Sequence, residues 1–435
     1  MVFATHSPSH PRSSRRVNHL SRHVVIIGAG VIGLSTAYYA LQRGLRVTVI
    51  DRAMEVRDGC SFGNAGMIVP SHFVPLAAPG IVGLGLRWMW KPESPFYIQP
   101  RFNRDLISWA YRFWRASTPA HVARSAPLLR DLSLISRRYF IELDEQGLDF
   151  GLKRSGLVML CRTQRGLDEE GHAADQAREL GLAAHLLDPA GLESLEPGVT
   201  MSVRGGVWYP QDCHLSPLRF MAALQREIRS AGGQLQWNAE VRGWRRESTT
   251  LLAVQTSKGE VQADEFVLCG GVWSPATVAS LGLRLPMQAG KGYSLTLDRP
   301  RQMPQRCAIF TEAKVAVTPM DGQLRFGGTM ELAGLDQSIN HRRVRGIVRA
   351  VSDYFPEFMA SDFDSVTPWR GLRPCTPDGL PYLGRTARWD NLTIATGHAM
   401  MGLSLAPVTG RLVSQLLTGE NPDIGLQRLS PDRFG

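Results

Sequence analysis

The stretch HVVIIGAGVIGLSTAYYALQRGLRVTVID, residues 23–51, decides the fold of this chain. The β-branched residues 24–27 predict that residues 23–27 form a buried strand, and residues 31–42 favour a helix. Residues 46–50 predict a second buried strand, which ends at Asp51. The order strand, helix, strand within 29 residues is a βαβ unit, so we expect a parallel sheet with helices packed against it.

The glycines between the first strand and the helix predict a dinucleotide site. Gly28 permits a tight turn, Gly30 lets the backbone approach a pyrophosphate, and Gly33 allows close packing of helix and strand. The helix N-terminus supplies free N–H groups for phosphates. Asp51 can accept hydrogen bonds from a ribose hydroxyl and would repel the 2′-phosphate of NADP. This segment therefore predicts FAD or NAD and leaves the choice open.

Further glycine turns follow at distant points of the chain. Residues 60–67 (CSFGNAGM) form a small-residue loop that can lie against a bound group or be an ordinary turn. Residues 265–274 predict a strand that leads into two glycines, and residues 391–404 predict a strand and a glycine turn before a helix at about 405–417. A helix N-terminus there could stabilise negative charge on a reduced flavin. These turns point to a large cofactor held by a discontinuous domain.

Residues 217–244 complete the same domain. Residues 217–231 predict an amphipathic helix and residues 235–244 a single strand, with Val241 placed where its backbone could meet an adenine.

Composition excludes several classes of protein. The 435 residues suggest two or three domains, and 43% hydrophobic with 20% charged residues is typical of a soluble globular protein. The six cysteines include no Cys-x-x-Cys, so we expect no metal site and no disulfide framework. The net charge of +10 comes without a run of five like charges, which argues against nucleic acid as a partner. We expect residues 1–22 to be a flexible tail, and residues 24–41 to be strand, turn and helix rather than a membrane span.

Four patterns resemble the D-amino-acid oxidase superfamily of FAD-dependent amine oxidoreductases. They are GAGVIGLSTAY, FGNAGMI, LCGGVWS and GLRPCTPDGLPYLG with GHAMMGLSLAP. KGYSLTL and the Trp- and Arg-rich residues 86–114 make the chain look most like bacterial D-amino-acid dehydrogenases. The resemblance implies an α/β Rossmann-like FAD-binding domain with an α+β substrate domain built on a mixed antiparallel sheet. We expect the FAD-binding domain to comprise residues 23–71, 205–285 and 367–435, and the substrate domain to comprise residues 72–204 and 286–366.

The resemblance also implies the chemistry. In this superfamily FAD is usually bound non-covalently, and the substrate Cα hydride passes to flavin N5. The arginine of Gly-Leu-Arg-Pro, here Arg373, would hold the substrate carboxylate, because a guanidinium matches a carboxylate bidentately. Arg370 competes for that role, or Arg373 is structural. Lys291 and Tyr293 lie on a strand that in relatives faces substrate or flavin, and alternation lets both point the same way.

Lys291 and Tyr293 could equally be packing residues. His398 would hydrogen-bond the flavin or move protons, or be structural, and His72 and His214 are weaker candidates. Cys375 lies near the region of covalent attachment in some sarcosine oxidases, but its offset from Thr376 differs, so we expect non-covalent FAD. The expected cofactor contacts are Gly28, Ala29, Gly30, Val31, Ile32, Gly33, Asp51, Arg52, Ser61, Asn64, Ala65, Gly66, Met67, Val241, Gly270, Gly271, Trp273, Gly397, Gly402, Leu403 and Ser404.

Substrate and acceptor follow from the same resemblance. The loop after Gly66 differs from that of D-alanine-type dehydrogenases, which favours a cyclic D-imino acid such as D-proline or cis-4-hydroxy-D-proline. We expect a quinone or another electron carrier rather than oxygen as acceptor. Residues 86–114 either contact a membrane surface or pack on the substrate domain. The expected location is cytoplasmic, with peripheral contact at the inner face of the cell membrane as one version of it. The alternatives are a glycine- or sarcosine-type oxidase using oxygen, a non-catalytic flavin-binding assembly factor and an RNA-modifying flavoenzyme.

Overall fold

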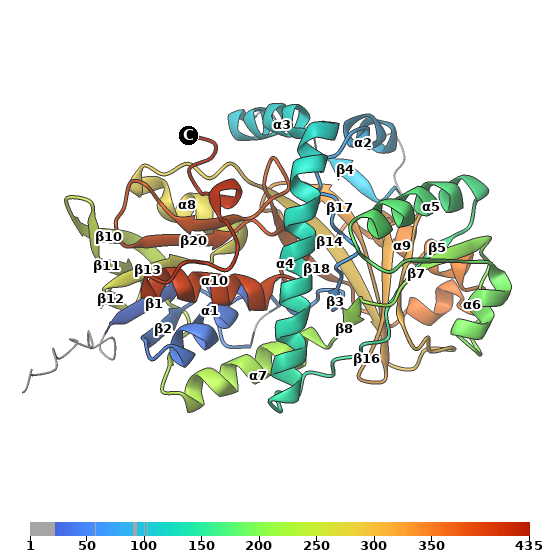
Figure 1. The fold of residues 1–435 in the computed structure, drawn as a ribbon, viewed down its shortest axis with the longest axis horizontal. Coiled ribbons are helices and arrows are strands. Elements are labelled where there is room, and N and C mark those ends of the chain that lie inside the picture. The colour runs from blue at the N-terminus through green and yellow to red at the C-terminus, as the bar shows by residue number, and fades with distance from the viewer. Residues whose placement is uncertain (1–21, 57, 90–93, 100, 102) are drawn as a thin grey trace, which may run out of the picture.

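The computed structural model describes residues 22–56, 58–89, 94–99, 101 and 103–435, and it confirms the mixed α/β class. Residues 1–21 of the expected tail lie outside this range. Two large sheets dominate, and Figure 1 shows the long helix α4 (Pro119–Glu145) running along the boundary between them. Among the described residues, no helix has both the length and the apolar composition that crossing a bilayer requires.

The first sheet has six strands and is built around the segment that opens the fold. Its order is β19-β20-β13-β1-β2-β9, and every neighbouring pair is parallel except β19 with β20. The bounds are β1 His23–Ile27, β2 Arg46–Ile50, β9 Gln234–Gln236, β13 Glu265–Leu268, β19 Tyr382–Arg385 and β20 Leu392–Thr396.

Helices cover one face of this sheet and a small sheet lies on the other. Val24 and Ile26 pack into a core with α1 (Val31–Gln42), α7 (Pro217–Ser230) and α10 (Ala406–Thr418). Their neighbours in β1 face a second core, which is shared with the three-stranded sheet. That sheet consists of β10 Val241–Glu247, β11 Thr250–Thr256 and β12 Gly259–Gln262. Because both faces of β1 are covered, all but the first of its residues can be apolar and buried.

The single strand expected over residues 235–244 is wrong. β9 ends at Gln236 and belongs to the six-stranded sheet, whereas β10 begins at Val241 and belongs to the three-stranded one. Between them Asn238 has a φ of 55°, a left-handed conformation that turns the chain out of the first sheet. Asparagine tolerates this conformation better than most residues, so the break had a sequence signal.

The second sheet has nine strands, in the order β18-β14-β17-β16-β15-β5-β7-β6, with β4 paired to β17. The bounds are β4 Phe96–Ile98, β5 Leu157–Cys161, β6 His185–Leu187, β7 Gly205–Tyr209, β14 Gln288–Leu297, β15 Cys307–Phe310, β16 Val315–Met320, β17 Gln323–Leu332 and β18 Trp369–Cys375. Two short strands, β3 Met67–Ile68 and β8 Cys213–His214, pair separately. The other helices are α2 Ile81–Met89, α3 Arg104–Ala116, α5 Gln164–Glu179, α6 Pro189–Leu195, α8 Ser274–Val278 and α9 His341–Tyr354.

The sheets do not follow the expected domain limits everywhere. β7 and β18 belong to the nine-stranded sheet, although they fall in ranges assigned to the FAD-binding domain. Conversely, α4 was assigned to the substrate domain, yet Leu132 and Phe140 on this helix join the core of the six-stranded sheet. Strand pairing decides the membership of β7 and β18, and core packing decides that of α4; contacts between residues far apart in sequence leave no local signal.

Candidate functional site

The turn between β1 and α1 leaves room for nothing larger than glycine at two positions. Gly28 has a φ of +106°, and a Cβ there would lie 2.5 Å from the carbonyl oxygen of Cys269. A Cβ on Gly33 would lie 1.8 Å from the carbonyl oxygen of Gly28. Gly30 differs, because the nearest atom to a Cβ there is the Ser61 hydroxyl oxygen at 3.5 Å. The turn is therefore tight on its inner side and open at Gly30, as the close approach of a pyrophosphate requires.

Backbone donors converge on this turn. Ala29 N–H donates to Asp51 Oδ2 at 2.7 Å, and Val31 N–H donates to Ser61 Oγ at 3.0 Å. Gly30 precedes α1 and has no side chain to cap it. Because no side chain of Gly30 caps the helix, phosphate oxygens can accept hydrogen bonds from N–H groups at the N-terminus of α1. Ile32, in contrast, is half-buried against the core.

A second group lies beyond the end of β2. The Arg52 guanidinium lies 3.8 Å from the centre of the Trp273 ring, a cation–π contact. Ala239 N–H donates to the Asp51 carbonyl at 2.8 Å, so the turn that leads to Val241 packs on the same strand end. Beside Trp273, a Cβ on Gly271 would meet nothing within 4 Å, whereas one on Gly270 would lie 3.2 Å from Ser274 Oγ. Open space at Gly30 and Gly271 with a stacked Arg–Trp pair suits a nucleotide cofactor.

The loop 60–67 joins the two sheets. Asn64 Oδ1 accepts from Gly66 N–H at 2.8 Å, and Ser294 Oγ donates to the Gly63 carbonyl at 3.2 Å. Arg325 Nη1 donates to the Asn64 carbonyl at 2.8 Å. Burial lowers the pKa of Arg325 to about 10. The loop is therefore fixed on β14 and β17, and Arg325 is a site residue that the sequence analysis missed, because it looks like any outward residue of a strand.

The rest of this loop is held as closely. A Cβ on Gly63 would lie 2.1 Å from the Trp369 ring, and one on Gly66 would lie 2.3 Å from the Leu215 carbonyl oxygen. Met67 is buried in β3 opposite His214, and Ala65 packs against the same cluster. The close packing of residues 63–67 therefore fixes the conformation of this loop.

Arg373 lies on β18 and crosses over β14. A Cβ on Gly292 would lie 2.2 Å from its Nη1, so the guanidinium occupies the space that this glycine leaves free. Nη1 donates to the Thr329 carbonyl of β17 at 2.7 Å. Arg370 is held elsewhere: it pairs with Asp58 and donates to the Gln337 carbonyl at 3.0 Å. Of the two arginines, only Arg373 lies beside the glycine-rich part of β14.

Lys291 and Tyr293 lie on the opposite face of β14 from Arg373. They do point the same way, because Lys291 Nζ is 3.9 Å from Glu331 Oε1 and Tyr293 donates to Glu331 Oε2 at 2.9 Å. Gly292 stands between them in the strand, and its free side faces Arg373. Lys291 Nζ also contacts Asp336 at 2.7 Å. The structure therefore does not bring these two side chains together with Arg373. The Lys291–Asp336 ion pair and the hydrogen bond from Asn340 N–H to the Tyr293 hydroxyl hold the segment that leads to α9.

The histidine candidates lie inside the protein, and the side chains of His398 and His72 have hydrogen-bond partners there, whereas the buried Nδ1 of His214 has none among the described residues. His398 Nε2 lies 3.0 Å from Thr409 Oγ1 on α10, and burial lowers its pKa to about 3. His72 Nδ1 lies 3.1 Å from Ser71 Oγ, and burial lowers its pKa to about 4. His214 also has a pKa lowered to about 4 by burial. All three are neutral at neutral pH.

The turn before α10 is partly structural. A Cβ on Gly397, whose φ is +81°, would lie 2.6 Å from the Thr376 methyl. Leu403 belongs to the core, and Ser404 Oγ accepts from Val69 N–H at 3.1 Å. Because α10 begins at Ala406, Gly402 and these two residues lie in the connection before the helix and not in its first turn. Gly402 is half-buried, with the nearest atom to a Cβ at 3.7 Å.

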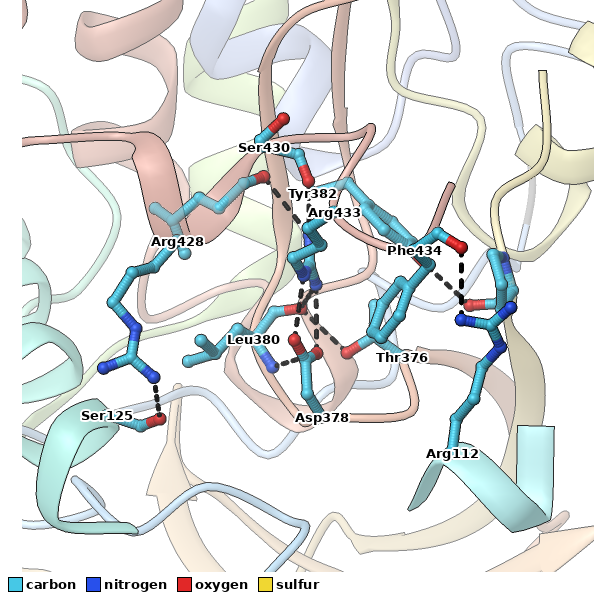
Figure 2. A network of polar contacts seen from close by, with 12 residues as sticks. Arg112, Ser125, Thr376, Asp378, Leu380, Tyr382, Arg428, Ser430, Arg433 and Phe434 are labelled. Atoms are coloured by element: carbon cyan, nitrogen blue, oxygen red, sulfur yellow. Dashed lines mark hydrogen bonds and ion pairs between the residues drawn. The ribbon is translucent and has the colours of Figure 1, made fainter. Parts of the chain in front are cut away.

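A buried ion pair fixes the turn that follows Arg373 (Figure 2). Arg433 Nε donates to Asp378 Oδ2 at 2.8 Å, and each side chain is 12% exposed. Arg433 also stacks on the Tyr382 ring at 4.2 Å and donates to the Leu380 carbonyl at 2.6 Å. Arg112 of α3 donates to the Phe434 carbonyl at 3.1 Å. Residues 433 and 434 thereby link α3 to the end of β18.

In the part of the chain that the structure describes, no cluster of His, Cys, Asp and Glu could hold a metal ion.

The glycine turn after β1 suits a dinucleotide, and Arg373 lies on the neighbouring nine-stranded sheet. This combination is typical of a nucleotide-dependent oxidoreductase. The chain matches the family described as FAD dependent oxidoreductase over residues 23–416, and it belongs to this family. The expectation of FAD and the resemblance to the superfamily are confirmed.

Relatives agree with this family, and solved structures show a similar fold. The chain is 32% identical to a D-amino acid dehydrogenase of Granulibacter bethesdensis, covering 94% of this chain and 99% of the relative. It is 34% identical to a D-amino acid dehydrogenase of Methylobacterium radiotolerans, covering 95% and 99%. Glycine oxidase from Geobacillus kaustophilus has a similar structure, with a TM-score of 0.76, 24% identity and coverage of 95% and 99%. L-proline dehydrogenase from P. horikoshii is similar at a TM-score of 0.70, 18% identity and coverage of 95% and 98%.

Proposed function

We propose that this protein is an FAD-dependent dehydrogenase of D-amino or cyclic D-imino acids. The D-amino acid dehydrogenases that match nearly its whole length support the activity. The observation that carries the proposal is the position of Arg373. Its guanidinium lies over Gly292 of β14, and the loop 60–67 packs on the same strand. A guanidinium in such a position binds a carboxylate, which every amino acid substrate supplies.

The residues of the chain have separable tasks in this reaction. The turn at Gly28, Gly30 and Gly33 would hold the FAD pyrophosphate, and Arg52 with Trp273 would flank its nucleotide end. FAD, when bound non-covalently, supplies the acceptor for the hydride that leaves the substrate Cα. Arg373 binds the substrate carboxylate and thereby fixes which hydrogen on Cα faces that acceptor. The Thr329 carbonyl holds Arg373 in place.

An anaerobic spectroscopic titration tests this proposal. The purified yellow protein is mixed with D-alanine, D-proline, cis-4-hydroxy-D-proline, glycine, sarcosine and L-proline singly, and loss of flavin absorbance is followed. We expect a D-amino or D-imino acid to bleach the wild type and Arg370→Lys, while Arg373→Ala stays yellow. Arg370 is the matched control because it lies on the same strand with its guanidinium bound elsewhere. Bleaching of Arg373→Ala at the wild-type rate would refute the proposal.

The finer substrate assignment is a cyclic D-imino acid. It is supported by the loop after Gly66, which differs from that of D-alanine-type dehydrogenases. Preferential turnover of D-proline or cis-4-hydroxy-D-proline over D-alanine is the expected result. A preference for glycine or sarcosine with oxygen as acceptor would instead favour the oxidase alternative. Reduction by no amino acid would favour a flavin-binding assembly factor.

For the electron acceptor we propose a membrane quinone, reached through α3. One side of α3 packs inward, with Trp109 Nε1 donating to the Cys375 carbonyl at 2.9 Å. The other side exposes Ile107, Tyr111 and Trp114, which are 61%, 57% and 59% exposed. These positions share a helical face, and Arg115 lies over the Tyr111 ring at 5.9 Å. Apolar and aromatic groups with arginine suit an anionic membrane surface.

Vesicle sedimentation tests the membrane contact. Vesicles of phosphatidylglycerol and phosphatidylcholine should carry down the wild type, and salt should weaken this binding because it screens the arginines. Ile107→Ser with Trp114→Ser should lose it while keeping the flavin spectrum. Failure of the wild type to bind at low salt would refute this part and leave the dehydrogenase proposal intact.

A further inference from the structure

We propose that Thr329 is a second contact for the substrate carboxylate, beside Arg373. This inference rests on the proposed function, because it assumes that Arg373 binds a carboxylate. It is carried by the position of Thr329 on the sheet, by its backbone conformation and by its hydroxyl group.

Position comes first. On β17, Arg325 reaches the Asn64 carbonyl, and the nearest atom to a Cβ on Gly327 is the Ala65 Cβ at 3.9 Å. Both residues therefore face the loop 60–67, and Thr329 follows Gly327 by two positions on β17, at the irregularity where the regular pairing with β14 is interrupted. The Thr329 carbonyl accepts from Arg373 Nη1, so the two residues are in direct contact. The residue lies where loop, sheet and guanidinium meet.

The backbone at Thr329 is strained. Tyr293 pairs with Gly328 and Lys291 pairs with Glu331, so Thr329 and Met330 together stand opposite Gly292 alone. This is a β-bulge, and Thr329 adopts a φ of 68° within it. A left-handed conformation is unusual for a β-branched residue, whereas glycine would adopt it freely. Strain of this kind is kept where a side chain or carbonyl is needed in one direction.

The hydroxyl supplies the reason for threonine. Thr329 Oγ1 is buried and has no hydrogen-bond partner among the described residues. A buried hydroxyl without a partner costs free energy. A carboxylate bound to Arg373 has further lone pairs that can accept from this hydroxyl.

Three substitutions separate these roles. Thr329→Val keeps the branched shape and the strain but removes the hydroxyl. Thr329→Ser keeps the hydroxyl. Thr329→Gly removes both the hydroxyl and the strain. We expect Thr329→Val and Thr329→Gly to raise KM for the best D-amino or D-imino acid about tenfold or more, with kcat changed less, since hydrogen bonds to charged groups have that magnitude. Thr329→Ser should stay close to the wild type.

A carboxylate probe and thermal unfolding complete the test. Acetate binding, followed by the shift of the flavin spectrum, should weaken in Thr329→Val and Thr329→Gly and not in Thr329→Ser. Thr329→Gly should unfold at a higher temperature than Thr329→Val, because glycine relieves the strain. A residue with only a packing role would not gain stability and lose acetate affinity in the same variant.

The outcomes distinguish this inference from the function on which it rests. If Arg373→Lys weakens substrate and acetate while Thr329→Val matches the wild type in KM and acetate affinity, the Thr329 inference fails alone. If Arg373→Lys also leaves both unchanged, the carboxylate site and the proposed function fail together. Should Thr329→Val not fold, Thr329→Gly against Thr329→Ser makes the same comparison.

Discussion

Gly292→Ala is the substitution that tests the arginine site most directly. The added Cβ would lie 2.2 Å from Arg373 Nη1 and 2.4 Å from its Nη2, whereas ordinary contact begins at 3.4 Å. The guanidinium must therefore move by about 1.2 Å, the difference between 3.4 and 2.2 Å. A misplacement of about 1 Å costs about a hundredfold in rate. We expect kcat/KM to fall about a hundredfold, or about 2.7 kcal/mol.

The fold should survive this change. Gly292 is not among the residues with positive φ, and the group that must yield is the end of a flexible side chain. Alanine in a strand is also somewhat more stable than glycine. Gly171→Ala, in α5 with nothing within 4 Å of its Cβ, controls for the replacement itself. Steady-state dye reduction, the flavin spectrum and thermal unfolding are measured together. A Gly292→Ala enzyme with unchanged kcat/KM would refute the placement of Arg373.

Three further predictions concern buried groups. Burial raises the pKa of Asp212 from 3.8 to about 7, so its contribution to stability is complete below pH 3.8 and is lost as the pH rises to about 7. Asp212→Asn should remove up to about 1.4 kcal/mol per pH unit of that dependence, and equal slopes for both proteins in unfolding experiments would contradict it. Burial lowers the pKa of His398 from 6.5 to about 3, so its contribution is complete above pH 6.5 and is lost as the pH falls. His398→Gln should flatten the loss of stability in acid and leave the activity profile above pH 6.5 unchanged, whereas a shifted profile would assign it a proton-transfer role. Arg433→Met should cost about 3 kcal/mol or more by leaving Asp378 unpaired, and adding Asp378→Asn should recover part of this in denaturant unfolding. A double variant that loses the sum of both single effects would show that the pair is not coupled.

The sequence was most informative where one residue type has one physical use. At Gly28 and Gly33 the structure leaves no room for a Cβ, which is the steric reason for glycine that the sequence suggested; their contact with the cofactor stays a prediction. The FAD-binding fold followed from the βαβ unit and from the family resemblance.

The substrate side was harder, because the relevant fact is which face of a strand each residue occupies. Lys291 and Tyr293 are as conspicuous in the sequence as Arg373, yet Gly292 between them is the residue that meets the arginine. Thr329 carried no signal, since its role depends on a bulge relative to β14, and a bulge is a property of two strands. Arg433 lies 55 residues from Asp378, and no local pattern links them.

The position of β1 in its sheet has a consequence for how the chain is made. β1 pairs with β2 at once, but its other neighbour is β13, and β13 pairs with β20. β13 must therefore leave the ribosome before β1 can have both of its partners. Arg433 must also leave the ribosome before it can bind Asp378 and fix the turn after β18. Such distant contacts slow folding and leave strand edges open during synthesis. The early βαβ unit would spend that interval as an unfinished sheet, in need of protection from association with other chains.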